Sequence, residues 1–138
     1  MENKIKVVIY GAGPIGIKIA QYITERDCYE IVGVIDMDPQ KIGKKLSELT
    51  GIKGSDIPIQ KSEDVLGKKD IDVVILTTTS SLIKTKPQIM EVLNHKINIV
   101  STCEELSYPW LTHPDIAKEI DETAKRNNVS VLGTGVNP

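Results

Sequence analysis

Short apolar runs rich in β-branched residues alternate along the chain with segments whose apolar residues recur at helical spacing. Two of these runs, residues 7–9 and 73–76, are almost continuously apolar, as expected of strands that helices cover on both faces. The alternation predicts an α/β fold with a doubly wound, parallel, six-stranded sheet in a single domain. The expected strands are residues 5–10, 31–36, 57–60, 72–78, 98–101 and 129–132.

The segment between the first two strands has the pattern of an amphipathic helix. Ile15, Ile19, Tyr22 and Ile23 stand at positions i, i+4, i+7 and i+8, and charged residues fall elsewhere around the turn. This spacing predicts that the four apolar side chains form the face that packs on the sheet.

Prolines and capping residues predict where further helices begin. Asp38 can cap a helix whose first residue is Pro39, and that helix is expected to run until Gly51. Pro87 and Pro114 each suit the first turn of a helix better than its interior, so two more helices are expected to begin there.

Length, composition and charge restrict the classes of protein that the chain could represent. Its 138 residues, 40% of them hydrophobic and 26% charged, fit one globular domain. The formal net charge is −2, from 17 basic and 19 acidic residues without a long charged block, which argues against binding to nucleic acid or to an anionic membrane. No apolar run approaches the roughly 20 residues that span a bilayer, and the first residues lack the pattern of a signal peptide, so a cytoplasmic location is expected.

The cysteines and histidines predict neither a metal site nor a catalytic triad. Cys28 and Cys103 stand in no paired motif, and His95 and His113 have no ligand or triad partner at a suitable spacing. The sequence therefore assigns no metal ligand and no catalytic residue.

A glycine motif follows the first expected strand and opens the first expected helix. Residues 11–16, Gly-Ala-Gly-Pro-Ile-Gly, spell G-x-G-x-x-G. In the dinucleotide-binding form of this motif the first glycine permits a tight turn, the second lets main chain approach a pyrophosphate, and the third lets helix and strand pack closely. The motif predicts an NAD(P)-binding domain of the Rossmann type, against the alternative of a glycine turn used only for packing. The residues expected to contact the cofactor are Gly11, Gly13, Pro14, Ile15 and Gly16.

An acidic residue ends the second expected strand. Asp36 lies about 20 residues after Gly16, where a carboxylate can accept hydrogen bonds from the adenosine ribose. With Met37 next and no arginine following, NAD is favoured over NADP as the cofactor. Nearby lysines at 41, 44 and 45 could soften that preference, although a solvated helix face is the favoured interpretation for them.

Polar residues also follow the fourth and fifth expected strands, at the edge of the sheet where a ligand binds in open α/β folds. Thr77, Thr78 and Thr79 either donate to the cofactor or cap the next helix. Thr102 and Cys103 are expected near the nicotinamide, with Cys103 as a small wall residue and not a nucleophile.

Two features near these residues keep both a functional and a packing interpretation. Glu104 and Glu105 could orient an amine, but ordinary surface carboxylates are favoured. The Tyr108-Pro109-Trp110 loop fits a lid over a substrate or simple packing.

Four stretches resemble the 2,4-diaminopentanoate dehydrogenase family, which is related to dihydrodipicolinate reductase. They are residues 7–16, residues 34–39 with 41–43, Ser-Thr-Cys-Glu-Glu-Leu at 101–106 and Gly-Thr-Gly-Val-Asn-Pro at 133–138. The resemblance implies NAD(P)-dependent oxidative deamination of a small diamino acid at an amine-bearing carbon, with release of ammonia. It also implies that residues 1–138 form the cofactor domain, and that a second domain beyond them holds the substrate and supplies contacts between subunits of a homo-oligomer. The chain alone is then expected to bind cofactor without turnover.

Two other interpretations stay open at this point. One is a dinucleotide-sensing module, in which NADH and NAD change the affinity for a protein partner without any chemistry. The other is a different oxidoreductase related to dihydrodipicolinate reductase, because a shared fold hosts many reactions.

Overall fold

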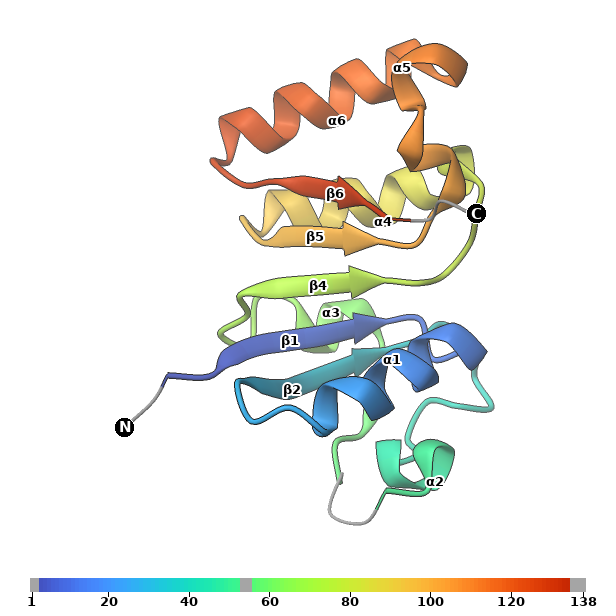
Figure 1. The fold of residues 1–138 in the computed structure, drawn as a ribbon, viewed down its shortest axis with the longest axis vertical. Helices are drawn as coiled ribbons and strands as arrows, with labels where there is room; N and C mark the ends of the chain where they lie inside the picture. The colour runs from blue at the N-terminus through green and yellow to red at the C-terminus, as the bar shows by residue number, and fades with distance from the viewer. Residues whose placement is uncertain (1–2, 53–55, 135–138) are drawn as a thin grey trace.

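The computed structural model describes residues 3–52 and 56–134, which form one six-stranded parallel sheet with helices on both faces (Figure 1). The strands lie in the order β3-β2-β1-β4-β5-β6, which confirms the predicted fold class. They are β1 (Ile5–Tyr10), β2 (Tyr29–Ile35), β3 (Ile59–Gln60), β4 (Val73–Leu76), β5 (Asn98–Ser101) and β6 (Val131–Gly133). The helices are α1 (Pro14–Thr24), α2 (Leu46–Thr50), α3 (Ser62–Val65), α4 (Leu82–Asn94), the 3-10 turn η1 (Glu104–Ser107), α5 (Pro109–Thr112) and α6 (Pro114–Arg126). The end of the Gly-Thr-Gly-Val-Asn-Pro stretch, residues 135–138, lies outside the described residues.

Alternate residues of β1 enter two separate apolar cores, one on each face of the sheet. Val7 and Ile9 pack with side chains from α1 and α2, whereas Val8 and Tyr10 pack with side chains from α3, α4 and α6. This is the alternation that a central strand requires when both of its faces are covered.

The direction of the crossovers explains which face each helix covers. From β1 the chain steps to β2 and β3 in one direction, and then from β3 it passes to β4, β5 and β6 in the other. Because crossovers between parallel strands are right-handed, the two directions place their helices on opposite faces. The face that carries α1 and α2 therefore receives no crossover helix over β4, β5 and β6 within the described residues.

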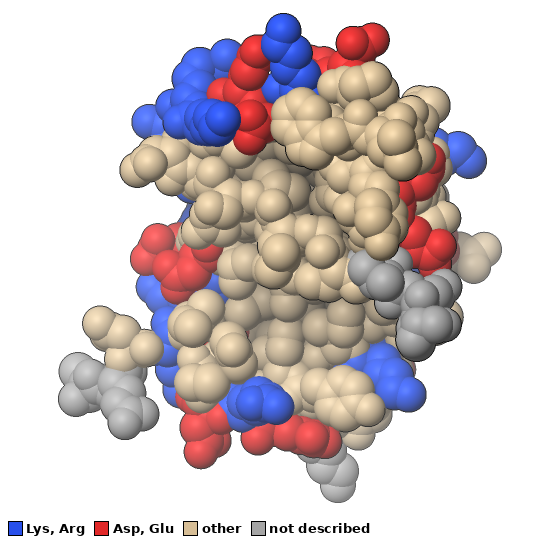
Figure 2. Space-filling view, turned by 45° about the horizontal axis from the view of Figure 1, so that its top comes forward, with Lys and Arg blue, Asp and Glu red and all other residues tan. Residues whose placement is uncertain are grey.

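Exposure along one row of paired residues shows the same uncovered area. Ile9, Ile75, Val100 and Leu132 are neighbours across β1, β4, β5 and β6. Ile9 beneath α1 is 1% exposed, Ile75 and Val100 are half-buried, and Leu132 is 58% exposed. A hollow of about 430 Å³ runs beside α1 over this part of the sheet, and Figure 2 shows a hollowed, uncharged area between charged side chains above and below. We call this area the bare face.

The buried side of α1 agrees with the predicted one only in part, since Ile19 and Ile23 pack on the core as expected. Gly16, Ala20 and Ile23 are buried, whereas Ile15 is 58% and Tyr22 57% exposed. Close approach at Gly16 is the reason, since a Cβ there would lie 1.9 Å from the Gly11 carbonyl oxygen. The small residues Gly16 and Ala20 therefore face the sheet together with Ile19 and Ile23, in place of Ile15 and Tyr22.

Two predicted helix starts were wrong. The segment after Asp38 is a turn, because the main chain around Gly43 pairs instead with Ile59: the Gly43 N–H donates to the Ile59 carbonyl (2.8 Å) and Gly43 has φ +91°. The helix begins only at Leu46, although it ends at Gly51 as expected. Pro87 lies inside α4, which begins at Leu82.

Candidate functional site

The three motif glycines lie in different surroundings. Gly11 has φ +115°, and a Cβ there would lie 2.8 Å from the Thr77 carbonyl oxygen. Gly16 packs against the Gly11 main chain, as described above. Gly13 has an ordinary φ of −81° and a Cβ on it would meet nothing within 4 Å. Packing explains Gly11 and Gly16 but not Gly13, whose open surroundings fit main chain that a ligand approaches closely.

The N-terminus of α1 offers an anion-binding end. Gly13 is the N-cap and Pro14 the first residue of this 11-residue helix, and no side chain caps its first turn. The first amides of a helix lack partners within the helix, and the helix dipole places partial positive charge there. Both features fit the pyrophosphate of a dinucleotide.

Asp36 follows β2 and binds the glycine loop directly. Its Oδ2 accepts from the Ala12 N–H (2.7 Å) and its Oδ1 from the Asp38 N–H (2.8 Å). These bonds hold the carboxylate beside the loop, and a carboxylate has about four acceptor sites, so it can still accept from ribose hydroxyls.

A cavity of about 330 Å³ joins the carboxyl ends of β1, β2 and β4. Of the predicted cofactor residues, it brings together Gly11, Gly13, Asp36, Met37, Thr77 and Thr78. Thr77 Oγ1 donates to the Gly11 carbonyl (2.9 Å), which ties the end of β4 to the loop. The predicted strand, glycine and carboxylate signals thus converge on one cavity.

Sequence reasoning missed two residues that line the same cavity, Lys41 and Gln88. Lys41 was expected on a solvated helix face, but its Nζ donates to the Ala12 carbonyl (2.9 Å) because residues 38–43 form a turn. Gln88 accepts a hydrogen bond from Thr78 Oγ1. The prediction missed Gln88 because it began the helix at Pro87, and the position of the helix start determines which side chains face the edge of the sheet.

The other predicted residues lie outside the lining of this cavity. Pro14 and Ile15 are exposed at the start of α1. Thr79 Oγ1 accepts from the Ser81 N–H (3.2 Å), but the N-cap of α4 is Ser81 and not Thr79. The Thr102 N–H donates to the Leu76 carbonyl, and Cys103 is buried with its Sγ 3.2 Å from the Ser80 carbonyl oxygen.

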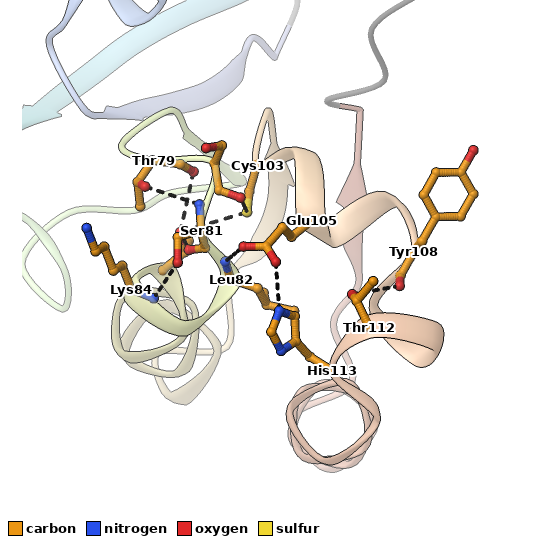
Figure 3. A network of polar contacts seen from close by, with 11 residues as sticks. Thr79, Ser81, Leu82, Lys84, Cys103, Glu105, Tyr108, Thr112 and His113 are labelled. Atoms are coloured by element: carbon orange, nitrogen blue, oxygen red, sulfur yellow. Dashed lines mark hydrogen bonds and ion pairs between the residues drawn. The ribbon is translucent and has the colours of Figure 1, made fainter.

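A second polar network lies after β5 and is shown in Figure 3. Glu105 Oε1 accepts from the Leu82 N–H (3.0 Å), and its Oε2 lies 2.7 Å from His113 Nε2. The hydrogen bond from His113, followed by that from Leu82, lowers the pKa of the Glu105 carboxyl below its ordinary value. Glu105 therefore ties the starts of α4 and α6 together, in place of the free surface carboxylate expected from the sequence. Tyr108 and Trp110 beside it are exposed.

Tyr10 is the last residue of β1, directly before the glycine loop. Burial, together with the Glu91 carboxylate that accepts from its hydroxyl (3.3 Å), raises its pKa to about 12. The hydroxyl is protonated at neutral pH and serves the packing of β1 against α4.

In residues 3–52 and 56–134, no three His, Cys, Asp or Glu side chains are grouped so that they could hold a metal ion. None of the helices described there has both the length and the apolar character needed to cross a membrane.

Comparison with known proteins agrees with this geometry. Residues 5–134 match the model of the oxidoreductase family with an NAD-binding Rossmann fold. The chain belongs to this family. The NAD-binding Rossmann fold of this family agrees with the predicted cofactor.

Similar proteins include an enzyme of the type that the sequence resembles. The chain is 39% identical over 138 residues to the 2,4-diaminopentanoate dehydrogenase of Acetoanaerobium sticklandii, which confirms the predicted resemblance. A solved amine dehydrogenase from Mycobacterium smegmatis is 30% identical, with a TM-score of 0.89 over 94% of the chain. The chain spans 39% of the length of each of these proteins.

A relative of another class matches a shorter part. The redox-sensing transcriptional repressor Rex of Caldicellulosiruptor saccharolyticus is 28% identical over 91 residues, which is 65% of this chain and 39% of that protein.

Proposed function

We propose that residues 1–138 are the cofactor-binding domain of an NAD(P)-dependent amino acid dehydrogenase. The cofactor role is supported by the open main chain at Gly13 and by the Asp36 carboxylate, which accepts from the Ala12 N–H of the same loop. The 39% identity to 2,4-diaminopentanoate dehydrogenase over 99% of the chain supports the substrate class. The reaction is the oxidative deamination of a small diamino acid, with 2,4-diaminopentanoate as the first candidate, in the cytoplasm.

The residues of this chain bind and orient the cofactor. The first amides of α1 and the main chain at Gly13 hold the pyrophosphate, and Asp36 accepts from the adenosine ribose hydroxyls. Thr77 and Thr78, at the end of β4, line the same cavity, and Thr77 Oγ1 donates to the Gly11 carbonyl. Bound there, NAD supplies the acceptor for the hydride that leaves the amine-bearing carbon.

We propose further that a second domain holds the substrate. The relatives are longer, since the chain spans 39% of the dehydrogenase. The bare face gives independent support: an apolar hollow of about 430 Å³ over β4 and β5 is the kind of surface that another part of a protein covers. Holding a substrate against the nicotinamide requires groups positioned within the same enclosed site.

Titration calorimetry and turnover of two protein forms test this proposal. We expect the 138-residue chain to bind NAD and to form no NADH with 2,4-diaminopentanoate. A form extended through the rest of the natural reading frame is expected to bind NAD and to form NADH. Turnover by the short chain at the rate of the extended form, or no NAD binding by either, would contradict the proposal.

The similarity to Rex supports a second candidate, a sensing module whose affinity for a protein partner depends on whether NADH or NAD is bound. A reading frame that ends near residue 138 would favour this module, whereas a further domain and diamino acid turnover favour the dehydrogenase. If the extended form oxidises another amino compound and not 2,4-diaminopentanoate, a different oxidoreductase related to dihydrodipicolinate reductase is the better description.

A further inference from the structure

Lys41 and Asp36 hold the glycine loop from both sides of Ala12. The Asp36 carboxylate accepts from the Ala12 N–H at 2.7 Å, and the Lys41 ammonium donates to the Ala12 carbonyl at 2.9 Å. Both side chains line the same cavity of about 330 Å³. An anionic and a cationic group thus stand together where the adenosine ribose is expected.

The turn between them fixes the position of the lysine. The Asp38 N–H donates to Asp36, and the N–H groups of Lys41 and Ile42 both donate to the Asp38 carbonyl, at 3.0 and 3.1 Å. The Gln40 N–H also donates to the Asp38 side chain, at 2.9 Å. These bonds connect the main chain of Lys41 through Asp38 to the Asp36 carboxylate, so the lysine approaches the loop from a defined side.

The charge of this lysine changes what the ribose pocket can accept. A lone carboxylate after β2 repels a phosphate on the 2′-hydroxyl, which is the usual reason for selecting NAD. An ammonium group in the same cavity offsets that repulsion. It has three N–H donors, of which the Ala12 carbonyl takes one, so two remain for phosphate oxygens.

We propose that Lys41 is a specificity-determining residue that binds the 2′-phosphate of NADP(H), so that the site takes both dinucleotides. The inference rests on the proposed cofactor function of the glycine loop. Asp36 serves the ribose of NAD, and Lys41 serves the additional phosphate of NADP.

Calorimetric titration of the wild-type chain, Lys41→Ala, Lys41→Arg and Lys44→Ala with NAD and NADP tests this role. We expect Lys41→Ala to weaken NADP binding about tenfold or more, because a charge-assisted hydrogen bond is lost, and to change NAD binding less than about threefold. Lys41→Arg, which keeps the charge, is expected to restore most of the NADP affinity. Lys44, exposed three residues further on, is the matched control, and Lys44→Ala is expected to change neither affinity.

Each other outcome has a distinct meaning. If Lys41→Ala weakens NAD and NADP equally, Lys41 only braces the loop and the inference is wrong. If the wild-type chain binds NAD but not NADP, the inference is also wrong, while the proposed function stands. If it binds neither dinucleotide, the proposed function itself fails.

Discussion

Two polar networks at the carboxyl edge of the sheet contain similar residues but have different roles. Around Ala12, Asp36 and Lys41 hold a loop that borders open space, with Gly13 facing a cavity of about 330 Å³. In the second network both carboxylate oxygens of Glu105 have partners: one accepts from the Leu82 N–H and the other is hydrogen-bonded to His113. A carboxylate near an expected cofactor is therefore a weak guide to function by itself. What distinguishes the first network is the unfilled space beside it.

The largest effect is expected from a side chain that fills the space beside Gly13. Gly13→Val is expected to leave the fold intact, because φ is −81° and no atom lies within 4 Å of the new Cβ. It should weaken NAD binding by roughly a hundredfold or more, since a branched side chain would displace the pyrophosphate from the main chain. Calorimetry measures the affinity, and the thermal midpoint measures the fold.

Gly16→Val is the contrasting variant, because its Cβ would lie 1.9 Å from the Gly11 carbonyl oxygen. It is expected to lower the thermal midpoint far more than Gly13→Val, which only replaces the N-cap glycine by a poorer capping residue. Equal losses of stability in both variants would mean that Gly13 serves packing, as Gly16 does.

Removing the carboxylate of the first network has the next largest effect. Asp36→Ala is expected to weaken NAD binding about tenfold to thirtyfold, because the ribose loses a charged acceptor and the Ala12 N–H loses its partner. Asp70→Ala is the control, since Asp70, which lies before β4, is an exposed carboxylate that pairs with Lys6. An unchanged NAD affinity in Asp36→Ala would show that the ribose lies elsewhere.

The second network is expected to make stability depend on pH and to leave cofactor affinity unchanged. The lowered pKa of Glu105 means that its stabilisation is present above its ordinary pKa of 4.5 and is lost as the pH falls through the lower value in the folded protein. Glu105→Gln is expected to lower the thermal midpoint at pH 7, and to differ less from wild type in acid. NAD affinity at pH 7 is expected to stay within about twofold, because Glu105 does not line the cavity.

Glu122→Gln is the control for that measurement, because Glu122 is exposed and its carboxylate lies 4.0 Å from the Lys118 ammonium. Its thermal midpoint is expected to stay close to wild type throughout the pH range. A Glu105→Gln variant that loses NAD affinity without losing stability would move Glu105 into the cofactor site.

The sequence predicts the fold and the centre of the site because both depend on local patterns. Strand periodicity and the glycine spacing of residues 11–16 identify β1, the loop and the start of α1. The end of β2 then follows from the acidic residue at Asp36.

The remaining residues depend on contacts that the predicted helix starts at Asp38 and Pro87 do not include. Lys41 faces the loop because the main chain at Gly43 pairs with Ile59, which prevents a helix after Asp38. Gln88 faces the cavity because Ser81 and Glu105 start α4 before Pro87. At Lys41 a capping signal competed with a hydrogen bond to a distant segment, and the distant bond prevailed. At Gln88 the signal of Pro87 competed with the local cap at Ser81, supported by the more distant Glu105.

Amide NMR spectra of the isotope-labelled chain, titrated with NAD, test the central claim most directly. We predict that the N–H signals of Ala12, Gly13 and Asp38 shift as NAD is added, while those of Leu82 and His113 stay in place. Shifts confined to the segment around Glu105, or none at saturating NAD, would contradict the assignment of the glycine loop as the dinucleotide site.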